Sequence, residues 1–135
     1  MFTAVIGIDT NVERAATQAR TVARIPDADE SVTAILLHDF SENPKGGTVE
    51  QVKSVRRARD ILEEVGIEVQ LEGTSGDASE AIIRSAEEHD ADRIVLAGRK
   101  RSPVGKALLG SVTQAVILNT ERPVLVCSTD DEAAE

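Results

Sequence analysis

Five short apolar runs alternate with segments of helical periodicity, and this alternation constrains the fold more than any other feature. The runs are residues 4–8, 32–37, 67–71, 93–97 and 124–127. Such alternation is typical of parallel strands joined by crossover helices, which are right-handed. The sequence therefore predicts a single α/β domain: a doubly wound, Rossmann-like sheet of five parallel strands with helices on both faces.

The apolar pattern of each run also predicts its place in the sheet. Runs 4–8, 93–97 and 124–127 are apolar on both faces, as expected for central parallel strands. Run 67–71 alternates between apolar and polar residues, so we expect it nearer an edge. Ligands of doubly wound sheets bind beyond the carboxyl ends of the strands, where the strand order reverses.

Four helices are predicted between the runs, each with a start signal. Asn11 caps the first, whose apolar positions run from Val12 to Ala23. The second begins at a capping box and ends at Gly66, the third begins at a capping box, and so does the last. The three boxes are Thr48 with Gln51, Asp77 with Glu80, and Ser111 with Gln114. The buried face expected for the last helix comprises Val112, Ala115, Val116 and Leu118.

Length and charge limit the classes of function. The chain has 135 residues, which suits one domain over residues 1–128, followed by an acidic tail at 129–135 that we expect to be disordered. Its net charge of −9 argues against binding nucleic acid. An acid-rich surface with only four lysines would suit a high-salt cytoplasm, and an ordinary acidic protein is the alternative.

Localisation is predicted from what the sequence lacks. No apolar stretch approaches the length of a membrane span, and no signal peptide is recognisable. The single cysteine, Cys127, lies within an apolar run and cannot form an intrachain disulfide. We expect a protein of the reducing cytoplasm without a membrane partner.

The stretch at residues 96–114, LAGRKRSPVGKALLGSVTQ, is the strongest candidate for a binding site. It combines cations and glycines with a predicted helix start, where free N–H groups and partial positive charge favour a phosphate. A solvated basic loop explains the charges equally well. GKA at 105–107 lacks the remaining residues of a P-loop, and GIDTNVE after the first run lacks a dinucleotide fingerprint.

Other polar residues suggest binding more readily than catalysis. Asp9 ends the first run, where it could accept from a base or ribose or help to hold a metal, or could only cap the turn. His38 and His89 lack partners at zinc-ligand spacing, so we expect structural roles and no metal site. No nucleophile has an evident base beside it, and no catalytic residue is predicted.

The chain resembles the universal stress protein family over nearly its whole length. The resemblance rests on the first run leading to Asp9, on LLHD, on GDASEAIIRSAEEHDADRIVLAGRK, and on LLGSVTQAVI before RPVLV. It implies a five-stranded fold of the adenine nucleotide alpha hydrolase-like type, and dimers paired through the last strand. Some members bind ATP through the motif G-x2-G-x9-G-[S/T].

The resemblance also implies a set of nucleotide-binding residues. Gly110 and Ser111 match the last two motif positions, whereas Ala97 and Lys100 stand where the family has glycine. By resemblance, residues 7–9 line the adenine and ribose, Asp39 offers backbone to the adenine, and the remaining residues contact phosphates. The full set is Gly7, Ile8, Asp9, Asp39, Ala97, Gly98, Arg99, Lys100, Gly110, Ser111, Val112 and Thr113.

Two functions remain open from the sequence. The first is a homodimeric, cytoplasmic stress-response module that binds ATP, with Mg²⁺ brought by the nucleotide, at the ends of the first and fourth strands. There Lys100 and its neighbours would replace a glycine contact with charge-assisted bonds. The alternative is a nucleotide-free dimerisation and partner-binding protein that has lost the ATP motif.

Overall fold

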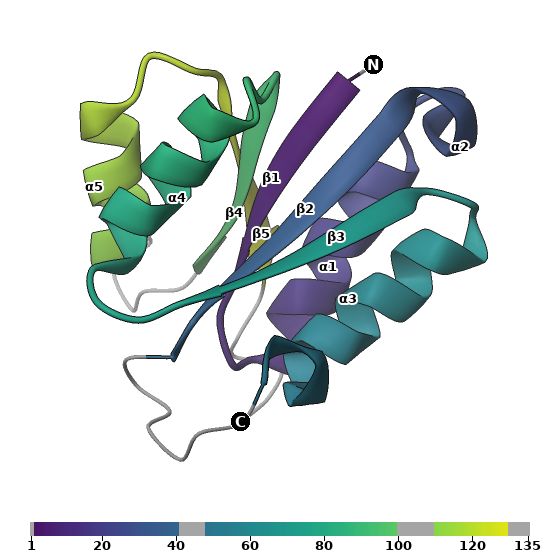
Figure 1. The fold of residues 1–135 in the computed structure, drawn as a ribbon, viewed down its shortest axis with the longest axis horizontal. Coiled ribbons are helices and arrows are strands. Elements are labelled where there is room, and N and C mark those ends of the chain that lie inside the picture. Colours follow the sequence, from purple (N-terminus) through teal and green to yellow (C-terminus); the bar gives the residue numbers. More distant parts are fainter. Residues whose placement is uncertain (1, 41–47, 100–109, 130–135) are drawn as a thin grey trace.

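Five parallel strands form one sheet in the order β3-β2-β1-β4-β5 (Figure 1). The computed structural model describes residues 2–40, 48–99 and 110–129. The strands are β1 (Phe2–Ile8), β2 (Val32–Asp39), β3 (Glu68–Thr74), β4 (Arg93–Arg99) and β5 (Val124–Thr129). The order runs outward in one direction from β1 to β3 and in the other from β4 to β5, which confirms the predicted doubly wound sheet.

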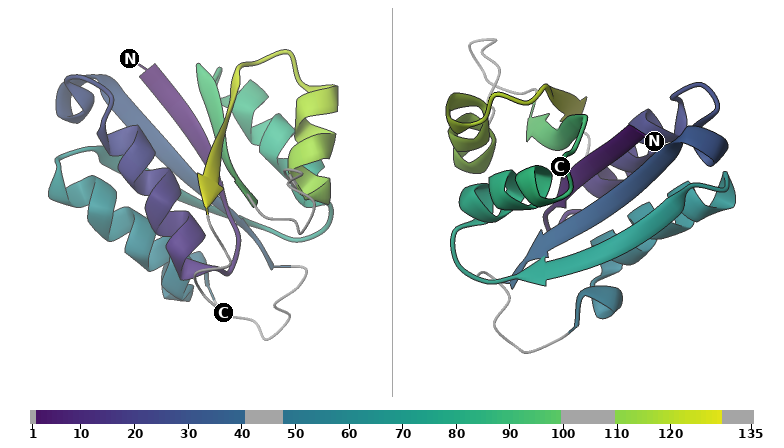
Figure 2. Two further views of the ribbon diagram at one scale, coloured as in Figure 1. Left: turned by 180° about the vertical axis from the view of Figure 1, so that it is seen from behind. Right: turned by 45° about the horizontal axis from the view of Figure 1, so that its top comes forward.

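Helices cover both faces of the sheet, as the two views of Figure 2 also show. α1 (Val12–Ala23) and α3 (Lys53–Glu64) pack together on one face, and α4 (Ala78–Glu88) and α5 (Ser111–Asn119) pack together on the other. A short α2 (Ala28–Ser31) leads into β2, and a 3₁₀ turn, η2 (Val49–Gln51), precedes α3. In the described ranges, no helix has the length and apolar character needed to cross a bilayer.

The core has two apolar layers, one on each side of the sheet. α1 contributes small residues, so that this helix lies close to the strands. The layer under α1 and α3 includes Ile6, Ile8, Ala15, Ala19, Val22, Leu36, Val55, Ala58 and Leu62. The layer under α4 and α5 includes Val5, Ile35, Leu37, Ala81, Ile82, Ala86, Ile94, Leu96 and Val116. Strands apolar on both faces are thus buried on both faces.

Several predicted helix signals are confirmed. The Asn11 side chain accepts from the backbone N–H of Arg14 at 2.8 Å and caps α1. Asp77 accepts from the N–H of Glu80 at 3.1 Å and caps α4. Gly66 follows α3 with φ +87°, the left-handed conformation expected of a helix terminator. β3 lies at an edge, as its alternating pattern predicted.

Two predictions about position are wrong. β5 lies at the sheet edge instead of the centre, although residues 124–126 are apolar and half-buried. An apolar run does not distinguish a covered strand from an edge strand whose second neighbour is another molecule. The capping box of Thr48 and Gln51 opens η2, and α3 begins only at Lys53.

The predicted start of the last helix is also wrong, and its predicted buried face is confirmed only at Val116. Gly110 is the N-cap of α5, with φ +84°, and Ser111 is its first helical residue, so the box of Ser111 and Gln114 does not form. Thr113 and Val116 are the buried residues of this helix, whereas Leu118 is 80% exposed. The apolar residues of this short helix are distributed over most of its circumference, so the apolar pattern could not specify which side is buried.

Candidate functional site

A cavity of about 860 Å³ opens at the point where β1 and β4 stop pairing and diverge. β1 pairs with β4 only as far as Ile6 and Val95, and beyond this point β1 continues beside β2 and β4 beside β5. We call it the switch-point cavity. Its described lining comprises Gly7, Ile8, Asp9, Thr10, Arg14, Leu37, His38, Asp39, Gly76, Asp77, Ala78, Ile82, Leu96, Ala97, Gly110, Ser111, Val112, Thr113 and Gln114.

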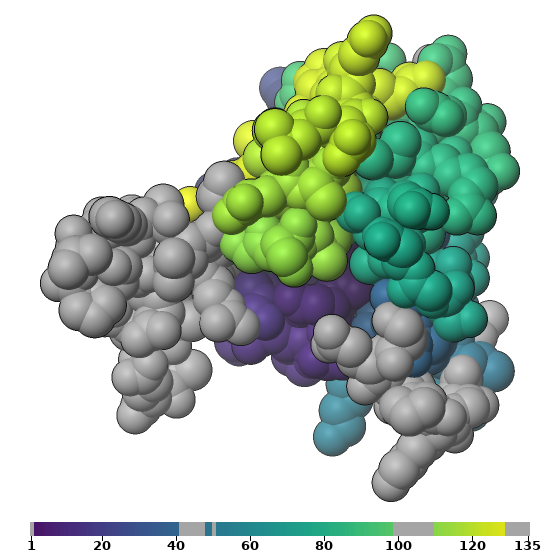
Figure 3. All heavy atoms as spheres, turned by 90° about the vertical axis from the view of Figure 1, so that its left-hand side faces the viewer, coloured from purple at the N-terminus to yellow at the C-terminus, as the bar shows by residue number. Residues whose placement is uncertain are grey.

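Gly7 lies where three elements meet at the base of the cavity. A Cβ atom on Gly7 would lie 2.9 Å from both Ile82 Cδ1 and Leu96 Cδ2, closer than side chains approach one another. The missing side chain therefore lets α4 and β4 close against β1. Figure 3 views the molecule from the side of α4 (teal) and α5 (yellow-green), which lie next to one another above the purple amino-terminal segment.

Three buried side chains hold the successive carbonyl groups at the end of β1. Gln18 donates to the carbonyl of Gly7 at 2.8 Å, and Ser54 donates to the carbonyl of Asp9. Nδ1 of His38 lies 2.8 Å from the carbonyl of Ile8, and because a carbonyl only accepts, this nitrogen carries the proton. Each of these side chains is at most 1% exposed. The end of β1 is thus fixed by side chains from α1, α3 and the neighbouring strand β2.

Gln18 also bridges the two diverging strands. Its Nε2 donates to the carbonyl of Val95 on β4 at 3.2 Å as well as to that of Gly7 on β1. These carbonyls lie just past the last ladder pair of β1 and β4, where each strand loses the other as a hydrogen-bond partner. One amide group therefore satisfies two carbonyls that the divergence would leave unpaired.

Asp9 is engaged in two interactions at the rim of the cavity. Its Oδ1 accepts from the N–H of Asn11 at 2.8 Å, and its Oδ2 pairs with Nε of Arg14 at 2.8 Å. The turn-capping role considered from the sequence is therefore present in the structure. Arg14 adds a cation to the cavity lining, and sequence reasoning did not identify it.

Two helix amino ends face the cavity, and they differ in how their N–H groups are satisfied. At α4, the Asp77 carboxylate accepts from Ser79 Oγ at 2.6 Å and from the Glu80 N–H. These bonds, that of Ser79 first, lower the pKa of Asp77 below its usual value of 3.8. At α5, the N-cap is Gly110, which has no side chain to donate or accept. The amino end of α5 therefore presents N–H groups that an anion could bind.

The predicted site residues divide into three groups. Gly7, Ile8, Asp9, Asp39, Ala97, Gly110, Ser111, Val112 and Thr113 line the cavity together. Thr113 also donates to the carbonyl of Ala97 at 3.3 Å and ties α5 to the end of β4. Gly98 is buried opposite Ser128 and does not belong to the described lining. Arg99 ends β4, and Lys100 lies outside the described residues.

The remaining candidates occupy structural positions. His89 Nε2 lies 2.6 Å from Oε2 of Glu72, whose other oxygen accepts from Ser85 at 2.8 Å, and the three join α4 to β3. Cys127 is buried, and burial raises the pKa of its thiol. Within the described ranges, no group of three or more His, Cys, Asp or Glu residues is placed to hold a metal ion.

Sequence reasoning missed Arg14, Gln18 and Ser54. Gln18 carried a usable signal, because it falls within the apolar stripe of α1 between Ala15 and Val22, where a polar residue needs a buried partner. Arg14 and Ser54 carried none, since their contacts with Asp9 depend on how the turn and α3 approach β1.

Comparison of sequences relates the chain to proteins of one family. The universal stress protein family matches residues 3–128. A universal stress protein of Methanocaldococcus jannaschii is 31% identical over 132 residues, covering 89% of this chain and 76% of the relative. One from Mycolicibacterium smegmatis is 38% identical over 65 residues, which span 47% of this chain and half of that relative's length.

Solved structures share the fold. A universal stress protein from Archaeoglobus fulgidus superposes with a TM-score of 0.69 at 27% identity, covering 93% of this chain and 98% of that one. A universal stress protein in complex with cAMP has a TM-score of 0.72 at 22% identity, with coverages of 96% and 98%. An Archaeoglobus fulgidus protein in complex with dAMP has 0.69 at 21%, with coverages of 93% and 97%. By its sequence and its five-stranded sheet, the chain belongs to the universal stress protein family.

Proposed function

We propose that this chain binds an adenine nucleotide in the switch-point cavity, with a phosphate group at the amino end of α5. The observation that carries the proposal is the glycine N-cap of α5, which supplies no side chain to cap the first N–H groups of a helix that borders the cavity. The cavity volume of about 860 Å³ lies within the range of ligand pockets, about 300–1,000 Å³.

Each part of the nucleotide has a suitable surface in this proposal. The base and ribose lie against residues 7–9 and beside Asp39, on the β1 and β2 side of the cavity. A ribose hydroxyl would donate to the Asp9 carboxylate, which Arg14 and Asn11 already hold in place. The phosphate would accept from the N–H groups of Ser111, Val112 and Thr113.

The complexes of related proteins with cAMP and dAMP support an adenine nucleotide as the ligand class. ATP is the finer proposal. The described lining holds three carboxylates, those of Asp9, Asp39 and Asp77, and one arginine, Arg14. Further phosphates therefore require added positive charge, which Mg²⁺ and the cations in the sequence between β4 and α5 would supply. We assign Arg99 and Lys100 to this role.

The same proposal includes a cytoplasmic homodimer paired through β5. This edge strand is apolar along residues 124–127, and unpaired apolar edges invite another strand. Two identical edges related by a two-fold axis must run antiparallel, because a parallel pair would set N–H against N–H at equal height. Sedimentation of a single monomeric species at micromolar concentrations would contradict this part of the proposal.

Native mass spectrometry of the purified protein, followed by calorimetric titration with AMP, ATP and Mg-ATP, tests the ligand. Gly66 supplies a control variant for Gly110, because both have a positive φ, +87° and +84°, and Gly66 lies at the end of α3. Either glycine changed to alanine should lose about 1–3 kcal/mol of stability: Gly110 through its backbone conformation, with ψ 155°, and Gly66 also because its Cβ would lie 3.1 Å from that of Asp29. Only Gly110→Ala should also weaken AMP binding, by about tenfold, as the α5 amino end shifts.

The outcome that contradicts the proposal is equally defined. A protein that carries no nucleotide after purification and releases no heat with millimolar AMP or ATP does not bind adenine nucleotides here. Equal loss of affinity in Gly66→Ala and Gly110→Ala would assign the effect to global stability and remove α5 from the phosphate site.

A further inference from the structure

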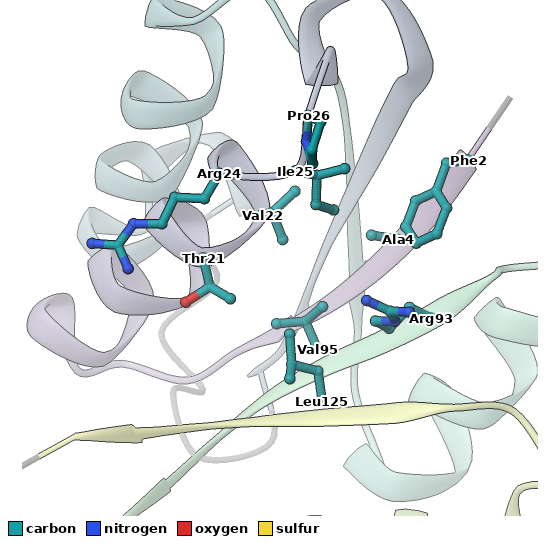
Figure 4. Close-up of a pocket in the computed structure, with 10 residues that line it drawn as sticks. All are labelled: Phe2, Ala4, Thr21, Val22, Arg24, Ile25, Pro26, Arg93, Val95 and Leu125. Atoms are coloured by element: carbon teal, nitrogen blue, oxygen red, sulfur yellow. The ribbon is translucent and has the colours of Figure 1, made fainter.

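A second cavity, of about 300 Å³, lies near the amino ends of the strands, whereas the switch-point cavity lies at their carboxyl ends. It is formed where α1 ends over the first residues of β1, β4 and β5, and we call it the amino-edge cavity (Figure 4). Its apolar lining includes Phe2, Ala4, Val22, Ile25, Val95 and Leu125. It shares no described residue with the switch-point cavity, so it is a separate site.

Arg93 is the charged group placed inside this apolar lining. Its Cζ lies 5.4 Å from the centroid of the Phe2 ring, and the residue is half-buried. In Figure 4, Arg93 lies beside Phe2, whereas the side chain of the second arginine, Arg24, extends away from Phe2 and Ala4. Stacking occupies the face of a guanidinium and leaves its in-plane N–H donors for another partner.

Those donors have no partner in the described part of the chain. No hydrogen bond or ion pair joins the side chain of Arg93 to another described residue, and no acidic residue belongs to the described cavity lining. A partly desolvated guanidinium is stabilised when a carboxylate accepts from two of its N–H groups together.

We propose that the amino-edge cavity binds a small carboxylate with an apolar body, held by Arg93. The carboxylate would pair with the guanidinium edge, and the body would lie against the partly exposed side chains of Phe2, Ile25 and Leu125. A cavity of about 150 Å³ can hold one benzene ring, so about 300 Å³ has room for a ring and a short acidic arm.

NMR titration of the full chain with phenylacetate, and with its neutral analogue phenylacetamide, tests the proposal. Saturable shifts are expected for the methyl groups of Val22, Val95 and Leu125, with phenylacetate binding about tenfold more tightly than phenylacetamide, as a charge-assisted bond requires. Arg93→Gln should abolish that preference. Arg24→Gln removes the same charge from the rim and should change phenylacetate affinity less than about threefold.

Arg93→Lys provides a second variant that keeps the charge and loses the planar fork, and we expect an intermediate preference for phenylacetate. If Arg93→Gln does not fold, the ratio between the two probes in the unaltered chain decides the question. Equal binding of acid and amide, equal losses in Arg24→Gln and Arg93→Gln, or no saturable shift at millimolar probe would each overturn the proposal. So would binding seen only after removal of residues 130–135, because the acidic segment of the chain would then be the occupant.

Discussion

The two sides of the switch-point cavity satisfy their backbone groups in opposite ways. On the β1 side, Gln18, His38 and Ser54 hold three successive carbonyls from beneath the sheet. On the α5 side, the helix begins at a glycine that caps nothing. The carbonyls of the β1 side thus have donors within the chain, whereas the N-cap of α5 has no side chain to satisfy the first N–H groups of its helix.

In the proposed recognition of a nucleotide, the two sides of the cavity have different roles: the β1 side fits the shape of the base and ribose, and the α5 side binds the charged phosphate. A fixed β1 end can act as a preorganised wall for the base and ribose, since its geometry does not depend on the ligand. In the proposal, binding adds hydrogen bonds at the α5 end, where Gly110 supplies no side-chain cap. α4 provides an internal reference, because its Asp77 carboxylate already does what a phosphate would do at α5.

The largest expected effect comes from breaking the bridge between β1 and β4. Gln18→Leu leaves the carbonyls of Gly7 and Val95 without their donor, and we expect a loss of about 2 kcal/mol in the free energy of unfolding. The affinity for AMP should also fall, because the end of β1 is no longer held in the conformation that contacts the base and ribose. Urea denaturation measures the first effect and calorimetry the second. Gln70→Leu, on the exposed side of β3, is the control and should alter neither by much.

A smaller effect is expected from the hydroxyl that holds the end of β1. Ser54→Ala removes the donor to the Asp9 carbonyl and should destabilise the protein by about 1 kcal/mol. Ser85→Ala is a matched control, because Ser85 is also buried and bonds to Glu72, away from the cavity. Both variants should lose similar stability in urea, but only Ser54→Ala should weaken AMP binding. Equal affinities of the two variants for AMP would show that Ser54 has no part in nucleotide binding.

The α4 cap makes a prediction about pH. Because the pKa of Asp77 is lowered by the Ser79 hydroxyl and the Glu80 N–H, folding favours its ionised form. Its stabilising contribution is then complete above pH 3.8 and is lost as the pH falls through the lowered value. Urea midpoints of the unaltered chain and of Asp77→Ala should differ at neutral pH and converge as the pH falls through the lowered pKa of Asp77. A constant difference across this range would contradict the role of the charge.

The smallest effect is expected for the ion pair at the cavity rim. Arg14→Gln removes the pair with Asp9, whose side chain is 48% exposed, so solvent screening limits the loss to less than about 1 kcal/mol. Arg59→Gln breaks the pair with Glu63, in which the N–O distance is longer, and this variant should lose still less stability. Stability in urea at low and high salt distinguishes them, and the Arg14 effect should shrink as salt is added.

The sequence predicts the architecture well because periodicity reports burial directly. The apolar stripe of α1, the cap at Asn11 and the terminator at Gly66 depend on neighbours within a few residues. The edge position of β5 was mispredicted because an apolar run does not report whether a strand has one neighbouring strand or two. Strand order also depends on which crossovers reverse direction, and local patterns do not encode that reversal.

The site was predicted in outline but not in its supporting contacts. The glycine and backbone positions facing the cavity follow from the strand ends and the start of α5, so residues 7–9 and 110–113 were identified together. Ser54 lies 45 residues from the carbonyl it satisfies, and the two bonds of Gln18 span 11 and 77 residues. Such contacts exist only once the layers have packed.

Amide NMR during titration with AMP tests the central claim most directly, because α4 and α5 present their amino ends to the same cavity. The account predicts saturable shifts of the Ser111, Val112 and Thr113 amide signals, and little change at Ser79 and Glu80, whose helix end Asp77 already caps. Shifts confined to the α4 amides, or no saturable shift at either helix, would contradict it.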